Sequence, residues 1–125
     1  MAVIELNKDN FEDTINNNAF VILDFWAPWC GPCKSFAPTY EKVSEDFPDV
    51  VFSKINTEDE QEIAAHFQIR SIPTLMIFRD QVIIYSEAGA LPEGALRQLV
   101  EQAATLDMDE VRKQIAESEA DSSKA

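Results

Sequence analysis

The sequence predicts an α/β fold in which helices flank one central mixed β-sheet. Strand-like and helix-like segments alternate along most of its 125 residues, and connections that pass through a helix favour parallel strand pairs. Late in the chain, two strand-like segments are separated by only three residues, which predicts a hairpin and therefore an antiparallel edge. A chain of this length can bury its own core as one domain without a metal or several disulfides.

The first third of the chain predicts two strands with a helix between them. Residues 3–6 alternate as in a short strand, and Asn7 can cap a helix that carries Phe11 and Ile15 on one face. Residues 20–26 are apolar apart from one acid and rich in β-branched and aromatic side chains, as expected of a strand buried on both faces.

The middle of the chain predicts two helices on either side of a strand. The first helix begins at the cysteines and runs to about Asp46, with a kink at Pro38, which lacks a backbone donor. Residues 50–55 form the strand, and the segment 58–62, in which four of five residues are acidic, opens a helix that reaches about Phe67. We interpret these acids as favourable charges at the positive end of a helix dipole, which requires no ligand.

The last third of the domain predicts a hairpin and a helix. Residues 74–78 and 82–86 form two strands around the connection at 79–81. Pro92 stands where the helix begins, since proline suits the first helical position. The apolar stripe of this helix consists of Leu96, Leu99 and Val100.

Net charge and hydropathy exclude several classes of partner. The chain has 10 Lys and Arg against 23 Asp and Glu, a formal net charge of −13, which repels nucleic acid and anionic membranes. It contains no run of about 18 apolar residues, so we expect no membrane span. The first residues lack the basic segment and apolar stretch of a signal peptide, so we expect a cytoplasmic protein.

The two cysteines, Cys30 and Cys33, lie within four residues of each other. A disulfide framework needs more cysteines at wider spacing, and a structural zinc site takes four ligands, whereas this chain adds only His66. We expect His66 to be a partly exposed helix residue, and no metal site. Two interpretations of the cysteine pair remain: a redox-active dithiol, or two cysteines without a shared function.

The spacing of the cysteines suits reversible disulfide chemistry. Residues i and i+3 of a helix have Cβ atoms roughly 5–6 Å apart, and a disulfide needs about 3.5–4.5 Å, so a small adjustment closes or opens the bond. Pro32 has its φ fixed and loses no necessary donor in a first turn, while Gly31 allows close approach of another backbone. Cys30 at the helix N-terminus is favoured as the attacking thiolate, and Cys33, one turn inside, as the resolving thiol.

Three separated motifs resemble the thioredoxin family. They are Asp-Phe-Trp-Ala-Pro-Trp-Cys-Gly-Pro-Cys-Lys at residues 24–34, Ile-Pro-Thr at 72–74 and Gly-Ala-Leu at 89–91. The resemblance covers roughly residues 3–104 and implies the thioredoxin fold, with a thioredoxin domain at 1–105 and an acidic extension at 106–125. The Gly-Pro pair between the cysteines resembles thioredoxins rather than protein disulfide isomerases or glutaredoxins.

The resemblance implies a thiol-disulfide oxidoreductase that reduces disulfides of protein substrates through Cys30 and Cys33. It also implies a monomer with no bound cofactor, whose redox-active disulfide is reduced again by an NADPH-dependent thioredoxin reductase. Two alternatives stay open: a binding module in which redox chemistry is incidental, and an oxidising role, against which Gly31-Pro32 argues. An insulin-reduction assay distinguishes a reductase from a binding module. A measured reduction potential distinguishes a reductase from an oxidising protein.

The resemblance also implies roles for individual residues. Asp24 matches a buried carboxylate whose pKa should be raised, and which could accept the proton of Cys33. Lys54 matches a lysine that approaches this acid. Asp24 could instead be a simple interruption of the strand, and Lys54 a plain surface charge. The substrate groove would consist of Trp29, Gly31, Pro32, Ile72, Pro73 and Gly89, with Pro73 in cis presenting the Ile72 backbone to an extended substrate.

The extension and the hairpin depart from the family pattern. Asp107 resembles the first residue of a capping box, and an apolar stripe predicts a helix of about ten residues that must pack against something. The domain itself, a second copy or a separate partner could supply that surface, and residues 118–125 are expected to be disordered. Many family members have glycine in the hairpin where 79–81 stand here, so the turn type is open. The stripe consists of Met108, Val111 and Ile115.

Overall fold

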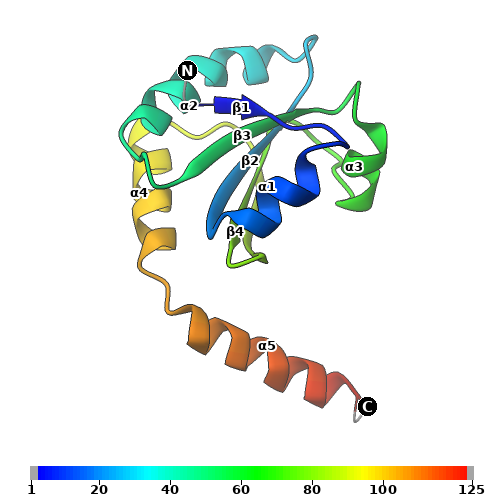
Figure 1. Cartoon of the computed structure of the whole chain (residues 1–125). Helices are drawn as coiled ribbons and strands as arrows, with labels where there is room; N and C mark the ends of the chain where they lie inside the picture. The colour runs from blue at the N-terminus through cyan, green and yellow to red at the C-terminus, as the bar shows by residue number, and fades with distance from the viewer. Residues whose placement is uncertain (1–2, 124–125) are drawn as a thin grey trace.

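The computed structural model describes residues 3–123, in which helices cover both faces of a five-stranded sheet (Figure 1). Its elements, in chain order, are β1 (Val3–Glu5), α1 (Phe11–Asn17), β2 (Phe20–Trp26), α2 (Gly31–Glu45), β3 (Val51–Asn56), α3 (Gln61–His66), β4 (Thr74–Arg79), β5 (Val82–Ala88), α4 (Glu93–Ala104) and α5 (Met108–Ser123). Among the described residues, no helix combines the length and the apolar character needed to cross a membrane.

The sheet is mixed, as the sequence predicts. Its strand order is β1-β3-β2-β4-β5, with β3 parallel to both β1 and β2. β4 pairs antiparallel with β2 and with β5. The central strand β2 is buried at six of its seven positions, which confirms the prediction of a strand covered on both faces.

Side chains of β2 alternate between two cores. Phe20 and Ile22 pack in the core that α2 and α4 cover, whereas Val21 and Leu23 pack in the core that α1 and α3 cover. Because strand side chains alternate with a period of two, Asp24 lies on the same face as Phe20 and Ile22, beneath α2.

Two helix starts differ from the prediction. Asn7 does not cap α1: its side chain accepts the backbone N–H groups of Asp9 and Asn10, and Asn10 is the N-cap residue. The third helix begins at Gln61 instead of residue 58, because residues 57–59 form a turn. Glu62 lies in the first turn of α3 and Glu60 is its N-cap residue, so the dipole explanation fits these two acids but not Glu58, which lies in the preceding turn.

The hairpin between β4 and β5 turns at Asp80 and Gln81. Both residues have positive φ angles, 51° and 67°, as a type I′ turn requires, and this turn matches the twist of the flanking strands. The turn therefore forms without glycine. The backbone N–H of Asp80 also donates to Ala19, which ties the hairpin to the start of β2.

Helix α5 is longer than the predicted ten residues and points away from the sheet (Figure 1). It continues through Ser123 where the sequence predicts disorder, because the segment has no proline or glycine to end it; residues 124–125 lie outside the described part. The start of α5 packs most closely against the domain: Met108 is buried, whereas Ile115 is 39% exposed. Arg112 joins the helix to Asp80 of the hairpin at 3.2 Å.

Candidate active site

The two cysteines form a disulfide at the junction of β2 and α2. After β2 ends, the backbone N–H of Cys30 donates to Ala27 in a tight turn, and Cys30 becomes the N-cap residue of α2. The Cα atoms of Cys30 and Cys33 are 5.3 Å apart, and both side chains are buried. The strand, the turn and the first helical turn thus place the pair where the sequence predicts.

The two sulfurs have different surroundings. The backbone N–H of Cys33 donates to the Sγ of Cys30 across 3.2 Å. The N-terminus of α2, with its free N–H groups and positive dipole end, favours negative charge at the same atom once the disulfide is reduced. This geometry favours a thiolate at Cys30, while Cys33 lies inside the first turn.

Residues from two distant segments meet at the pair. The Ile72-Pro73 peptide bond is cis, and the carbonyl oxygen of Ile72 lies 3.8 Å from the Sγ of Cys30. The backbone N–H of Gly89 donates to the carbonyl of Pro73 across 2.8 Å. Gly89 has a φ of 117°, which L side chains rarely adopt, so glycine suits this position.

Trp29 is the exposed aromatic residue of the site. Its side chain is 67% exposed, and its Nε1 donates to the carboxylate of Glu58 across 2.5 Å. Trp26 instead packs partly buried against the redox pair. A pocket of about 180 Å³ beside Trp29 is lined by Trp29, Thr57, Ala64, Ile69, Arg70, Ser71 and Ile72.

Sequence reasoning missed Glu58 as a member of the site. Glu58 is one of several neighbouring acids in the sequence. Because all of them are interpreted as charges at a helix N-terminus, the sequence does not single out Glu58. The available signal is its place in the turn after β3, since side chains that follow parallel strands gather at the same edge of a sheet.

Asp24 is a buried carboxyl, only 4% exposed, on the face of the sheet that α2 covers. Loss of hydration on burial raises its pKa from 3.8 to about 7, and the positive charge of Lys54 partly opposes this rise. Its Oδ1 has no hydrogen-bond partner among the described residues. A carboxyl of this kind can gain and lose a proton near neutral pH.

Lys54 lies opposite Asp24 in the register of β2 and β3, so the two side chains share a face of the sheet. The ammonium group lies over the ring of Trp26, with Nζ 5.0 Å from the ring centroid. In the described part of the chain the two charges form no ion pair within 4.0 Å, so Lys54 acts on Asp24 through its field.

The remaining candidate ligands are dispersed. Within residues 3–123, no cluster of three or more His, Cys, Asp or Glu side chains is placed to hold a metal ion. His66 is exposed on α3, and its ring packs edge-on against Phe67 with centroids 4.8 Å apart.

Comparison with known proteins gives consistent matches. The thioredoxin family model matches residues 2–102. The chain is 56% identical over 119 residues to "Putative thioredoxin 2" of Streptomyces coelicolor, covering 95% of this chain and 89% of that protein, so the match extends into the C-terminal segment. It is 43% identical over 98 residues to a thioredoxin of Pyropia yezoensis, covering 77% of this chain and 92% of that protein.

Solved structures resemble the chain in the same way. A mutant thioredoxin from Halobacterium salinarum superposes with a TM-score of 0.77 at 30% identity, over 84% of this chain and 93% of that one. Thioredoxin F from spinach chloroplast superposes with a TM-score of 0.76 at 33% identity, over 83% of this chain and 95% of that one.

Proposed function

The chain belongs to the thioredoxin family, and from this premise we propose that it reduces protein disulfides, with Cys30 as the attacking and Cys33 as the resolving cysteine. It is a thiol-disulfide oxidoreductase with an intramolecular redox disulfide and no bound cofactor. The observation that carries the order of attack is the hydrogen bond from the Cys33 N–H to the Cys30 Sγ at the N-terminus of α2.

The proposed reaction transfers two electrons to the substrate. In the reduced protein, the Cys30 thiolate attacks one sulfur of the substrate disulfide, which forms a mixed disulfide and releases the other substrate sulfur as a thiolate that takes up a proton. Cys33 then loses its proton and attacks the Cys30 sulfur. This step restores the Cys30–Cys33 disulfide and releases the second substrate thiol.

Asp24 is proposed as the acceptor of the Cys33 proton. Its pKa of about 7 matches a base that operates near neutral pH, and its burial beneath α2 places it on the same side of the sheet as the helix that carries Cys33. Lys54 is proposed as an electrostatic partner that keeps this pKa from rising further.

The substrate surface is proposed to surround the disulfide on its exposed side. Gly31, Pro32 and Trp29 are exposed beside the pair. An extended substrate backbone can pair with the main chain of Ile72, whose carbonyl lies 3.8 Å from the attacking sulfur. Pro73 and Gly89 complete this surface, since they are joined by a hydrogen bond.

The proposal includes the setting in which the protein works. We assign the thioredoxin domain to residues 1–105 and the acidic extension to residues 106–125, and we propose a monomer in the cytoplasm. An NADPH-dependent thioredoxin reductase regenerates the dithiol. Family membership supports these assignments, and the net charge of −13 favours a soluble, self-repelling chain.

The experiment is reduction of insulin in the presence of NADPH and a bacterial thioredoxin reductase, with dithiothreitol as an independent source of electrons. We expect NADPH oxidation coupled to insulin reduction, with Cys30→Ser as the inactive control. Absence of turnover with both electron sources would favour a binding module. Turnover with dithiothreitol alone would remove that reductase from the proposal and leave disulfide reduction in place.

A further inference from the structure

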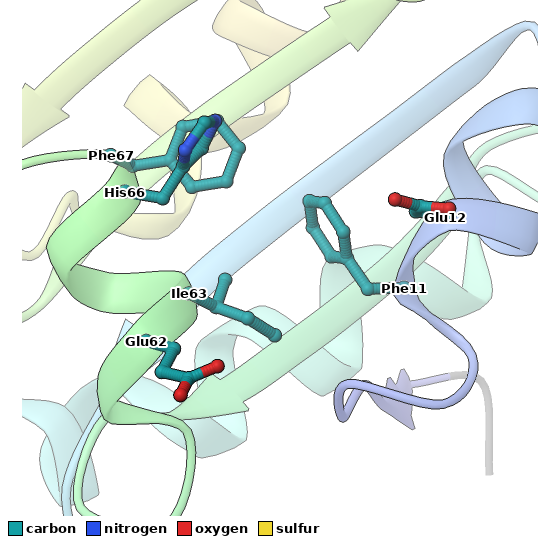
Figure 2. Close-up of a pocket in the computed structure, with 6 residues that line it drawn as sticks. All are labelled: Phe11, Glu12, Glu62, Ile63, His66 and Phe67. Atoms are coloured by element: carbon teal, nitrogen blue, oxygen red, sulfur yellow. The ribbon is translucent and has the colours of Figure 1, made fainter.

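A second pocket opens between α1 and α3, on the face of the sheet opposite α2 (Figure 2). Its volume is about 240 Å³. None of its lining residues belongs to the redox site. The residues that line this α1–α3 pocket are Phe11, Glu12, Glu62, Ile63, His66 and Phe67.

The floor of the α1–α3 pocket is apolar and aromatic. Phe11, Ile63 and Phe67 are half-buried and pack against the core on this side of the sheet. The rings of Phe11 and Phe67 meet edge-on with centroids 5.7 Å apart, so the two helices hold the floor together. One side of this aromatic surface remains open to solvent, where it can gain free energy by contact with an apolar group.

The rim of the pocket is negatively charged. Glu12 comes from α1 and Glu62 from α3, and Figure 2 shows their carboxylates on different walls of the opening. Both side chains are exposed, and neither forms a salt bridge or a side-chain hydrogen bond with another residue in the range 3–123. The net charge of −13 adds to the attraction of a cation to this rim.

The size and chemistry of the pocket narrow the possible occupants. Small-molecule sites usually occupy about 300–1,000 Å³, so this pocket suits a single side chain rather than a whole ligand. An acidic group would be repelled by the rim, and a purely apolar group would remove water from the carboxylates without replacing it. The complementary side chain has an apolar stem and a cationic end.

We propose that the α1–α3 pocket binds an arginine side chain of a partner protein. The aliphatic stem contacts Ile63, the planar guanidinium stacks against an aromatic ring of the floor, and its N–H groups donate to a rim carboxylate. Arginine fits better than lysine because its planar, weakly hydrated cation combines stacking with directed hydrogen bonds. This binding does not depend on the redox chemistry.

The test is an NMR titration of the oxidised full-length chain with N-acetyl-arginine amide, followed through backbone amide signals. We expect saturable shifts at Phe11, Ile63 and Phe67, and no comparable shifts at Cys30. The citrulline analogue has the same shape without the charge, so we expect its affinity to be lower by about tenfold or more.

Paired variants separate the pocket from general charge attraction. Glu12→Gln with Glu62→Gln should weaken arginine binding by about fivefold or more, since the fold does not depend on these exposed side chains. Glu117→Gln with Glu119→Gln removes the same charge from the exposed part of α5 and should leave binding unchanged.

Three results would overturn the proposal. They are the absence of saturable shifts at the floor residues, equal affinity for the citrulline analogue, and equal loss of affinity in the two double variants. Because every measurement uses the oxidised protein, a failure of the proposed reductase function would not affect the outcome.

Discussion

The indole nitrogen of Trp29 donates a 2.5 Å hydrogen bond to the carboxylate of Glu58. This bond joins the most exposed aromatic side chain of the site to the turn that precedes α3. A side chain that is 67% exposed has few packing contacts to orient it, so this hydrogen bond restrains the direction of the indole.

Loss of this hydrogen bond should weaken substrate binding more than it slows catalysis. We expect Glu58→Ala to raise the KM for insulin by about fivefold, since one charge-assisted hydrogen bond contributes about 1 kcal/mol or more, and to leave kcat within about twofold. Asp59→Ala is the matched control, because this neighbouring exposed acid has no bond to the indole. A KM equal to that of the control would contradict the role of Glu58.

Substitution of each cysteine should have a different effect. Cys33→Ser should accumulate mixed disulfides with protein substrates, because Cys30 still attacks and nothing resolves the product. Cys30→Ser should form none, since Cys33 lies inside α2 without the N-terminal position that favours a thiolate. Non-reducing electrophoresis and mass spectrometry measure the trapped species. Trapping by Cys30→Ser alone would reverse the assignment.

Removal of the Asp24 carboxyl should slow resolution. We expect Asp24→Asn to lower the rate at which Cys33 resolves the mixed disulfide by about 100-fold at pH 7, because an amide cannot accept the proton. The rate in the unmodified protein should rise with pH around the pKa of about 7, and this inflection should disappear in the variant. Stopped-flow measurements from pH 6 to 9 test both points. Identical pH profiles would remove Asp24 from the mechanism.

Burial of Asp24 should also make stability depend on pH. Its pKa is about 7 in the folded chain and 3.8 when hydrated, so the folded state binds the proton more tightly. The protonated Asp24 contributes to the free energy of unfolding. This contribution is complete below about pH 4, declines as pH rises, and is lost above about pH 7. The difference of about 3 pKa units corresponds to at most about 4 kcal/mol.

Urea unfolding at several pH values measures this contribution. We expect Asp24→Asn to be more stable than the unmodified protein at pH 8–9 and to lack the decline between pH 4 and 7. Asp49→Asn, a change at an exposed acid, is the control and should follow the unmodified protein. A decline of equal size in Asp24→Asn would assign the pH dependence to other groups.

Removal of the C-terminal extension should affect stability more than activity. We expect a chain that ends at Thr105 to reduce insulin within about twofold of the full chain, because every proposed redox residue precedes this point. The free energy of unfolding should fall by about 1–2 kcal/mol, mainly from the loss of Met108 burial, since Met108 is 6% exposed whereas Ile115 is 39% exposed. A truncated protein that folds normally but loses turnover would place α5 in the catalytic machinery.

Local sequence patterns predict the redox pair and most of the fold. The apolar run at β2 predicts a doubly buried strand because it is short and rich in β-branched and aromatic residues. The Cys-Gly-Pro-Cys segment that follows it predicts a helix start because proline suits that position. Errors at helix ends arise where side chains compete for backbone groups, as in the turn that Asn7 stabilises before α1.

Contacts between distant residues could not be predicted in this way. Glu58 looks like one acid among several until β3 and β2 lie side by side and bring its turn to Trp29. The ammonium group of Lys54 lies over the ring of Trp26. The direction of this side chain depends on how the neighbouring side chains pack, which the local sequence does not specify. The C-terminal stripe is regular in sequence, yet its exposure increases along α5, from 6% at Met108 to 39% at Ile115, because the helix points away from the sheet (Figure 1).

The sequence by itself determined the order of strands and helices along the chain, the place of the redox pair at a helix N-terminus and the doubly buried strand that carries Asp24, because each depends on residues close together in the chain. Only the tertiary structure decided which side chains meet across the sheet: the antiparallel neighbour of β2, the carboxylate that orients Trp29 and the α1–α3 pocket. These features depend on how several elements pack at once, and a side chain takes its final direction only when its neighbours from other elements are in place.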